Sequence, residues 1–343
     1  MKLLIAIGRH FMYNIVETDF HPREANTVTS ETARHGSEIS PKLKRLGQRL
    51  KNDWQIYVLL APALAFFVVF CYFPMYGVQI AFRDFKAVSG ITDSQWVGLL
   101  HFRDFFSSYY CARMFRDTFL LNFYGLIFGF PIPLILAIML NQIDHPRFKG
   151  FTQTVIYVPH FISTVVLAGM IFLLFDPGTG LVNRLAVWMG GQSTFYLMEA
   201  RWFRPLFVGS DVWQHSGWNT ILYLAALTGI SPELYEAATI DGANKRHKII
   251  HIDIPHLLPI ATMMLILNCG SLLSSNTDKA LLLQTSGNIE TSDIIGVYQY
   301  TVGLSKAQYS YTSAIGLFLN VINFVIIMFV NSVSRKLGET SLF

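Results

Sequence analysis

Few residues in this chain have the type and spacing that chemistry on a substrate requires. Asp211 and His215 lie four positions apart, so a helix would place a carboxylate beside an imidazole, as general acid–base catalysis needs. His247 and His251 have the same separation, which suits a metal pair. The second pair lies among three basic residues, which would repel a metal ion, so we interpret it as solvated surface and predict no metal site.

Other patterns that carry chemistry do not occur in the sequence. It contains no Gly-x-Ser-x-Gly nucleophile turn and no Gly-x-x-x-x-Gly-Lys-Ser/Thr loop that would hold nucleotide phosphates. Its three cysteines, Cys71, Cys111 and Cys269, have no metal or disulfide spacing. We therefore predict that the chain binds no cofactor directly. Asp211 with His215 is the one candidate pair for a membrane-embedded enzyme.

The elements that would position these residues are long and apolar. Hydrophobic residues make up 52% of the chain and charged residues 14%, with a mean hydropathy of +0.40, whereas soluble domains carry about 25% charged residues. Six stretches reach the roughly 20 apolar residues that a membrane-spanning helix needs. They are residues 56–82, 119–142, 152–175, 205–227, 257–275 and 312–334. We predict an all-α integral membrane protein with six transmembrane helices in residues 51–343.

Several predicted spans carry polar side chains at helical spacing. On the fifth span, Asn268, Ser271 and Ser275 recur at i, i+3 and i+7. Polar groups within a membrane usually face the bundle interior or a cavity, although hydrogen bonding between helices is a simpler alternative. The candidates for lining a cavity are Asn122, Trp218, Asn219, Asn268, Ser271, Ser275 and Asn320.

The second span contains small residues and prolines. Gly125 and Gly129 form a GxxxG pattern, which predicts a close approach of another helix. Pro131 and Pro133 follow, and proline removes a backbone hydrogen bond, so we expect a kink there.

A polar segment, residues 230–256, separates the fourth and fifth spans. Ser231 favours the position that caps a helix, and Pro232 favours the first helical position. These residues predict a short helix that runs to about Ile240.

A turn and a second helix should follow in the same segment. Asp241-Gly242 predicts the turn, since glycine tolerates left-handed backbone geometry and would let a second helix pack closely. The second helix, residues 243–253, should stop before Pro255, because the residue before proline avoids helical geometry. Two short helices at an angle would form a rigid knob that transmits force from a soluble partner. An ordinary loop at the membrane interface would account for the same sequence features equally well.

This segment resembles the EAA loop of the permease subunits of binding-protein-dependent ABC importers. The resemblance rests on a long spaced pattern, which is far more specific than a short motif. Its residues are Glu236, Ala237, Ala238, Asp241, Gly242, Ala243, Ile252, Pro255 and Pro259. The family usually has an aromatic residue at the position of Ile249, which is a mild departure.

The resemblance extends over about residues 50–343. Segments that resemble the family occur at residues 96–102, 157–161, 175–183, 217–227 and 338–343. The last of these is similar to the LplB-like branch of polysaccharide and oligosaccharide permeases, the neighbourhood of the alginate importer. A departure occurs at residues 275–279, Ser-Asn-Thr-Asp-Lys, where that branch tends to have a Gly-Phe-Glu-like run.

The resemblance implies a fold, a function and partners. It implies the permease fold of type I ABC importers, in which an ATPase groove would hold a cytoplasmic coupling helix. The coupling residues would be Glu236, Ala237, Ala238, Asp241, Gly242 and Ala243. The implied partners are a second homologous permease, two copies of an ABC ATPase that binds ATP and Mg, and an extracytoplasmic solute-binding protein.

The same resemblance implies an oligosaccharide as the transported solute. Amide side chains hydrogen-bond sugar hydroxyls and aromatic faces cover sugar rings, so the seven polar and aromatic candidates named above would line its path. An ABC permease for a non-sugar solute is the alternative, and a membrane-embedded enzyme is a weaker one.

Basic residues predict the orientation in the membrane. The loops that we assign to the cytoplasm hold twelve Lys and Arg in 60 residues, and those on the other side hold ten in 101. By the positive-inside rule both termini are cytoplasmic, in a bacterial cytoplasmic membrane. Residues 1–50 are predicted as an uncleaved, partly disordered tail. The net charge of +4 is too small and too dispersed to indicate nucleic acid binding.

Overall fold

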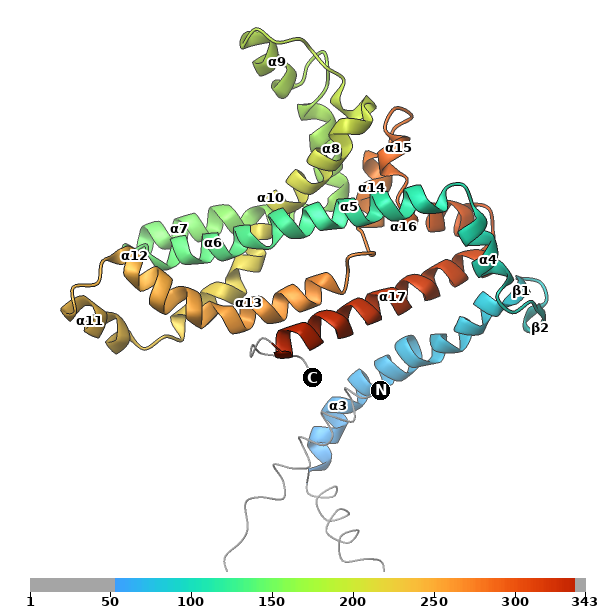
Figure 1. The fold of residues 1–343 in the computed structure, drawn as a ribbon, viewed down its shortest axis with the longest axis horizontal. Coiled ribbons are helices and arrows are strands. Elements are labelled where there is room, and N and C mark those ends of the chain that lie inside the picture. The colour runs from blue at the N-terminus through green and yellow to red at the C-terminus, as the bar shows by residue number, and fades with distance from the viewer. Residues whose placement is uncertain (1–52, 337–343) are drawn as a thin grey trace, which may run out of the picture. The chain divides into compact units, whose positions relative to one another are not determined.

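The computed structural model describes residues 53–336, which are mostly helical (Figure 1). This confirms the predicted all-α class. The tail predicted for residues 1–50 and the family-like residues 338–343 lie outside the described residues. The chain divides into two units, Met1–Val69 and Phe70–Phe343, and each is considered by itself.

The first unit contains α3 (Trp54–Phe66), and the π-helical turn η1 (Phe67–Tyr72) spans the boundary between the units. The second unit contains, in chain order, η2 (Phe73–Phe82), β1 (Arg83–Lys86), β2 (Gly90–Trp96), α4 (Leu100–Ser107), α5 (Cys111–Gly129), α6 (Pro131–Asn141), α7 (Pro146–Tyr157), η3 (Val158–Phe161), α8 (Thr164–Leu174), α9 (Leu181–Trp188), η4 (Tyr196–Met198), α10 (Ala200–Thr228), α11 (Pro232–Ile240), α12 (Lys245–Lys248), η5 (Ile249–Asp253), α13 (Ile254–Cys269), α14 (Thr277–Leu283), α15 (Ile289–Ser292), α16 (Ile295–Gln299), η6 (Tyr300–Ser305) and α17 (Tyr309–Lys336).

Four predicted spans correspond to helices that are long and apolar enough to cross a membrane. They are Trp54–Phe82, Cys111–Asn141, Lys245–Cys269 and Tyr309–Lys336. The third predicted span is a pair of helices, Pro146–Phe161 and Thr164–Leu174, bent by 97°. Counting this pair as one span brings the number to five, so the predicted count of six stays a prediction.

The fourth predicted span is α10, which is long enough to cross a membrane but is more polar than the other candidates. It carries Asp211, Gln214 and His215 along its middle. It packs against α5, α6, α7 and α13, and its buried side chains run from Phe203 to Leu227. Polar side chains of a membrane helix usually face the bundle interior or a cavity, so a helix that contacts four others can carry them. By contrast, the residues of α3 are almost all apolar.

A short hairpin was not anticipated from the sequence. β1 and β2 pair antiparallel, with Arg83 opposite Trp96 and Asp84 opposite Gln95. The guanidinium of Arg83 donates hydrogen bonds to three carbonyls of the β2 strand, at 3.0–3.1 Å. The hairpin therefore turns the chain between η2 and α4, and both of these elements pack against α17.

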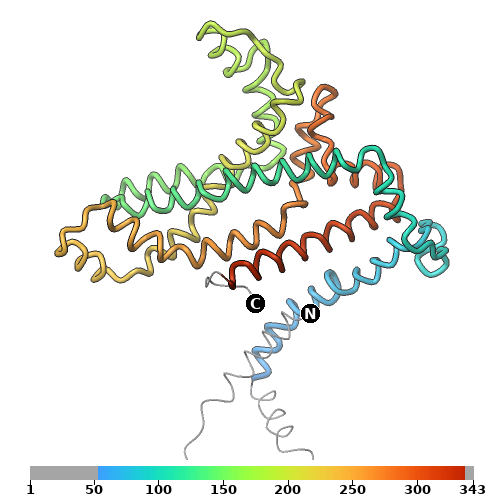
Figure 2. The backbone as a smooth tube through the Cα atoms, in the orientation of Figure 1, coloured from blue at the N-terminus to red at the C-terminus, as the bar shows by residue number. Residues whose placement is uncertain are grey.

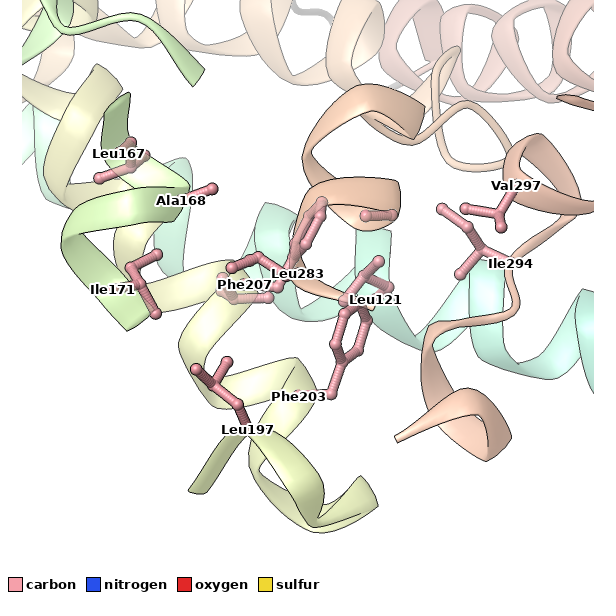
Figure 3. Close-up of a cluster of buried hydrophobic side chains, with 12 residues drawn as sticks. Leu121, Leu167, Ala168, Ile171, Leu197, Phe203, Phe207, Leu283, Ile294 and Val297 are labelled. Carbon is pink, nitrogen blue, oxygen red and sulfur yellow. The ribbon is translucent and has the colours of Figure 1, made fainter. Parts of the chain in front are cut away.

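Three clusters of buried apolar side chains hold the second unit together. One gathers α5, α8, α10, α14 and α16 around Phe203 and Phe207 (Figure 3). A second joins α6, α10 and the start of α13, and a third joins α4, α5 and α17. Tyr235 of α11 and Ile252 pack against the second cluster. α11 and α12 sit where the chain turns at one end of α6 and α13 (Figure 1 and Figure 2).

The close helix contact occurs at a different glycine from the one expected. A Cβ at Gly125 would meet nothing within 4 Å, and one at Gly129 would meet only Val212, at 3.9 Å. At Gly217 a Cβ would lie 1.8 Å from the carbonyl oxygen of Ile156, so the crossing of α10 and α7 requires glycine. Within residues 53–336, no helix therefore approaches Gly125 or Gly129 closely. The regular helix is interrupted near the predicted kink, because α5 ends at Gly129 and α6 begins at Pro131.

Candidate coupling and pathway sites

The short helix predicted from Pro232 to Ile240 is α11, with the bounds expected. Ser231 occupies the capping position with extended backbone geometry, and Pro232 takes the first turn. The Ser231 hydroxyl makes no capping hydrogen bond. Glu233 lies in the first turn, where a carboxylate interacts favourably with the helix dipole.

The turn after α11 depends on Gly242. Its φ is +78°, in the left-handed region. The Ala243 N–H donates to the Ala238 carbonyl at 2.8 Å, and the Gly242 N–H donates to the Thr239 carbonyl at 3.0 Å. This pair of bonds defines a Schellman motif. A Cβ at Gly242 would meet nothing within 4 Å, so glycine is needed here for its backbone geometry and the expected close packing is absent.

The second helix does not stop before Pro255, contrary to the prediction. It begins at α12, where the Asn244 side chain accepts a hydrogen bond from the His247 N–H at 3.0 Å. It then continues through the π turn η5 into α13. Because a π turn shifts the backbone hydrogen bonds by one residue, the chain can pass through Pro255 without ending the helix.

The outer surface of the α11–α12 segment, residues 231–253, is open and partly apolar. Glu236 and Ala237 are exposed, and Ala238 and Ala243 are half-buried. Ile240 is 87% exposed and lies at the end of α11. Most described charged residues of the segment lie on this exposed surface, so it combines carboxylates, lysines and an apolar tip in one small area.

The inner side of the segment rests on a buried carboxylate that the sequence analysis did not single out. Asp253 is fully buried, and its Oδ1 accepts a hydrogen bond from the Tyr235 hydroxyl. Its Oδ2 accepts one from the Gln142 amide at 2.9 Å. The Asn141 amide donates to the Tyr235 hydroxyl at 3.4 Å. Burial and the bond to Asp253 raise the pKa of Tyr235 to about 12. The available signal was an aspartate within the apolar run of residues 249–254.

Three predicted pathway residues lie together. Trp218, Asn219 and Asn268 line one cavity of about 460 Å³ formed by α5, α6, α10 and α13. Trp218 is 44% exposed and stacks on His160 with the ring centroids 4.4 Å apart. The Phe161 ring packs edge-on against Trp218, with the ring centroids 5.9 Å apart. The result is an aromatic surface beside amide groups, which suits a sugar ring.

The other predicted pathway residues are arranged differently. The sequence predicted that Asn268, Ser271 and Ser275 share one helical face. α13 ends at Cys269, so Ser271 and Ser275 do not continue that face and the prediction was wrong. The Ser275 hydroxyl donates to the Asn122 side chain at 3.0 Å, and the Asn122 amide donates to the Leu272 carbonyl at 2.9 Å. These bonds join α5 to the chain between α13 and α14, so Asn122 and Ser275 hold the fold together as hydrogen-bonding residues. The Ser271 hydroxyl bonds the Asn268 carbonyl at 2.9 Å.

Asn320 and its neighbour on α17 have different surroundings. Asn320 is exposed, whereas Asn323 is buried and joins α17 to the chain beyond α13. Its oxygen accepts from the Leu273 N–H at 3.3 Å, and its amide donates to Ser274 at 3.2 Å.

The segment that departs from the family pattern supplies a buried cation. Lys279 is 1% exposed, and its Nζ lies 3.2 Å from Asp211 Oδ1 and 3.0 Å from the Phe207 carbonyl oxygen. His215 Nδ1 lies 3.5 Å from the same carboxylate oxygen. Asp211 therefore has an ion-pair partner in α14 as well as its neighbour one turn along α10.

The second histidine pair forms a local contact. His251 Nδ1 lies 3.0 Å from the His247 carbonyl oxygen, and both side chains are exposed. Within residues 53–336, no group of three or more His, Cys, Asp or Glu side chains could hold a metal ion.

The helical bundle thus carries a small exposed two-helix segment and a mostly apolar cavity that Trp218, Asn219 and Asn268 line. The chain belongs to the family of binding-protein-dependent transport system inner membrane components, whose family model matches residues 113–339. It is therefore a membrane-embedded permease component and not an enzyme, so Asp211 and His215 are not a catalytic pair.

Similar proteins with known roles occur in Bacillus subtilis (strain 168). The chain is 37% identical over 302 residues to the polygalacturonan/rhamnogalacturonan transport system permease protein YteP, covering 88% of this chain and 94% of that one. It is 39% identical over 294 residues to protein LplB, covering 86% of this chain and 92% of that one.

A solved structure has the same fold. The chain matches one in the crystal structure of a bacterial ABC transporter that imports the acidic polysaccharide alginate, with a TM-score of 0.78 and 36% identity, covering 85% of this chain and 99% of that chain. A second structure of an alginate ABC transporter, in complex with an alginate pentasaccharide-bound periplasmic protein, gives a TM-score of 0.78 at 35% identity, covering 87% of this chain and all of that one.

Proposed function

We propose that this chain forms half of the translocation pathway of an ATP-driven importer for an oligosaccharide that an extracytoplasmic solute-binding protein delivers. The observation that carries this proposal is the match, over at least 85% of the chain, to the permease of an alginate importer and to YteP. Both relatives handle acidic polysaccharides by name or description. An oligosaccharide that carries carboxylates is therefore the first substrate class to test.

The remaining subunits follow from the same relatives. A complex between the alginate transporter and its periplasmic protein supports a solute-binding partner here. We propose a second homologous permease and two copies of an ABC ATPase, on which ATP and Mg bind. We place the chain in a bacterial cytoplasmic membrane with both termini in the cytoplasm, as the distribution of basic residues favours.

A non-sugar solute is the alternative, and the degree of similarity disfavours it. The sn-glycerol-3-phosphate permease UgpA of Pectobacterium atrosepticum is 28% identical over 64% of this chain, compared with 37% over 88% for YteP. The aromatic surface of Trp218 and His160 beside Asn219 also fits a sugar ring better than a small phosphate ester.

The coupling role belongs, in this proposal, to Glu236, Ala237, Ala238, Asp241, Gly242 and Ala243. Two observations support it. The Schellman turn holds the helix end rigid, and Ile240 projects into solvent with 87% of its surface exposed. An exposed apolar tip on a rigid helix suits a groove on a soluble protein.

Replacing Gly242 tests the coupling role. Gly242→Val puts a β-branched residue at φ +78°, which strains the turn. We expect the assembled complex to keep hydrolysing ATP while sugar uptake falls about tenfold or more, as a cost of about 1–3 kcal/mol in backbone strain would give. Gly190→Val is the matched control, because Gly190 has φ +86° and equally open surroundings but lies after α9. Normal uptake in Gly242→Val would count against the assignment.

The substrate class is tested on the solute-binding partner. Isothermal titration with alginate, polygalacturonan and neutral arabino-oligosaccharides, followed by uptake of the same sugars, would identify it. Binding of the acidic sugars supports the proposal. Binding of a phosphate ester and no sugar would favour the alternative.

A further inference from the structure

A buried hydrogen-bonded cluster joins the exposed helix α11 to two long helices. Tyr235 belongs to α11, Asn141 and Gln142 lie at the end of α6, and Asp253 lies directly before α13. The three side-chain bonds described above connect these four residues into one chain of donors and acceptors. Asn141 and Gln142 are 94 and 111 positions from their partners, and Tyr235 and Asp253 are 18 positions apart.

The two oxygens of the buried carboxylate have separate partners. The Gln142 amide and the Tyr235 hydroxyl both donate to Asp253, one to each oxygen, while the Asn141 amide donates to the Tyr235 oxygen. Each of these groups thus has a hydrogen-bond partner within the cluster, with one donor for each oxygen of Asp253. Among residues 53–336, no Lys, Arg or His forms an ion pair with Asp253. Neutral donors alone therefore hold this carboxylate.

Burial makes these bonds costly to lose. Asp253 has 0% exposure, so water cannot replace a missing donor, and a buried polar group without a partner is destabilising. Tyr235 and Ile252 also pack against the apolar cluster formed by α6, α10 and α13. A displacement of α11 must carry the ends of α6 and α13 with it or leave the carboxylate unsatisfied.

We propose that Asp253, held by Tyr235 and Gln142, is the positioning residue that makes α11 move as one rigid body with the ends of α6 and α13. The inference rests on the proposed coupling role of α11. It adds the route by which a displacement at that helix reaches two helices whose side chains line the cavity containing Trp218 and Asn268.

An exposed ion pair provides a matched control. Lys245 Nζ lies 3.6 Å from Asp144 Oδ2 and joins the same two regions of the chain, but their side chains are 71% and 92% exposed. Exposed pairs contribute little because water screens them. If mere contact between the regions mattered, removing this pair would have the same effect as removing the buried cluster.

The first experiment measures coupling in the complete transporter. The complex, with its second permease, ATPase and binding protein, is reconstituted in vesicles with Mg-ATP and the alginate or polygalacturonan oligosaccharides. We expect Tyr235→Phe and Asp253→Leu to lower the sugar transported per ATP about tenfold, since each removes a bond to a buried charged group. We expect Asp253→Asn to stay within about twofold of wild type, because a flipped Gln142 amide can hydrogen-bond it. Lys245→Ala should also remain near wild type.

The second experiment follows the rigid-body motion and needs no sugar. After replacement of Cys71, Cys111 and Cys269 by serine, spin labels are attached at Glu233→Cys in α11 and Met139→Cys in α6, both exposed positions. In the assembled complex we expect the distance between the labels to be the same with and without Mg-ATP. In Tyr235→Phe and Asp253→Leu we expect it to broaden or shift when nucleotide binds.

The outcomes separate the two proposals. If the wild-type complex takes up no oligosaccharide, the proposed substrate class fails, and the label distances still test the rigid body. If Tyr235→Phe assembles normally and keeps both the wild-type coupling ratio and the fixed distance, the positioning role is wrong even if Asp253→Leu does not fold. A nucleotide-dependent change in the wild-type distance would overturn it as well.

Discussion

Two buried carboxylates in different parts of this protein are stabilised in opposite ways. Asp253, beneath α11, accepts hydrogen bonds from neutral groups only. Asp117, in the first half of α5, is equally buried. Its Oδ1 lies 2.8 Å from Arg204 Nη2 and 3.0 Å from Arg116 Nε. Breaking a buried ion pair costs about 3–5 kcal/mol, whereas a hydrogen bond to a charged group contributes about 1.5–3 kcal/mol.

The difference indicates which part of the bundle depends most on a single contact. Buried Lys279 of α14 pairs with Asp211 of α10, whose side chain is 41% exposed, so the helices around α5, α10 and α14 are joined by charges. The contacts under α11 are hydrogen bonds from neutral donors, each of which contributes less than a buried ion pair. We therefore expect the ion-paired region to be the fixed frame of the bundle, and the α11 region to lose less stability than that frame when one bond is removed.

The largest expected effect is an asymmetry between the two partners of the α14–α10 pair. Asp211→Leu leaves Lys279 buried without a counter-charge, so we expect a loss of about 3–5 kcal/mol in the free energy of unfolding. Lys279→Met removes the buried cation and leaves Asp211, which is 41% exposed, in contact with water. We expect that variant to lie within about 1–2 kcal/mol of wild type. Thermal unfolding in detergent measures both, and equal losses would contradict the ion-pair frame.

Arg204 tests the frame at Asp117. Arg204→Met leaves the carboxylate with Arg116 alone, so we expect a loss of about 3 kcal/mol. The control is Arg201→Met, because Arg201 is 72% exposed and pairs with Glu199, and we expect a change below about 1 kcal/mol. If the two variants unfold at the same temperature, Asp117 does not depend on Arg204.

A smaller effect is expected under α11. Gln142→Leu removes one neutral donor from Asp253 and keeps the volume of the side chain. We expect a loss of about 1.5–3 kcal/mol in unfolding free energy, less than for Asp211→Leu. The ranking from the same unfolding assay decides the comparison, since a loss as large as that of Asp211→Leu would make the two regions alike.

The smallest effect concerns pH. Burial raises the pKa of Asp293 above its ordinary value of 3.8, although Arg113 opposes the shift. A carboxyl with a raised folded-state pKa contributes stability that is fully present below pH 3.8 and is lost as the pH rises through the raised pKa. Asp293→Asn should remove this loss, so its stability relative to wild type should increase over that window. Unfolding midpoints of both proteins from about pH 3.5 to 7 measure the difference, and parallel curves would show that Asp293 does not titrate there.

Features that depend on neighbouring residues were predicted well from the sequence. The start of α11 at Pro232, its end at Ile240 and the left-handed Gly242 all follow from residues a few positions apart. The stop before Pro255 was wrong, because a π turn accommodates the proline in a continuous helix. The end of the fifth span was placed six residues too late, since the chain leaves the helix after Cys269.

Among the pathway candidates, the sequence could not separate lining residues from structural ones. Asn122 and Asn268 have the same side chain on neighbouring apolar helices. One is used in hydrogen bonds to Leu272 and Ser275, and the other faces the cavity beside Trp218. Only the positions of the facing helices distinguish them.

The amino-acid sequence by itself determined that the chain is a bundle of apolar helices with one short helical segment at a defined place, because hydropathy, capping and turn geometry act over a few residues. The tertiary structure alone decided which polar side chains are held and by what. The partners of Asp253 lie 18 and 111 positions away in the sequence. Arg204 lies 87 positions from Asp117, and Lys279 lies 68 positions from Asp211. Burial raises the strength of such pairings, and burial exists only once the helices have packed.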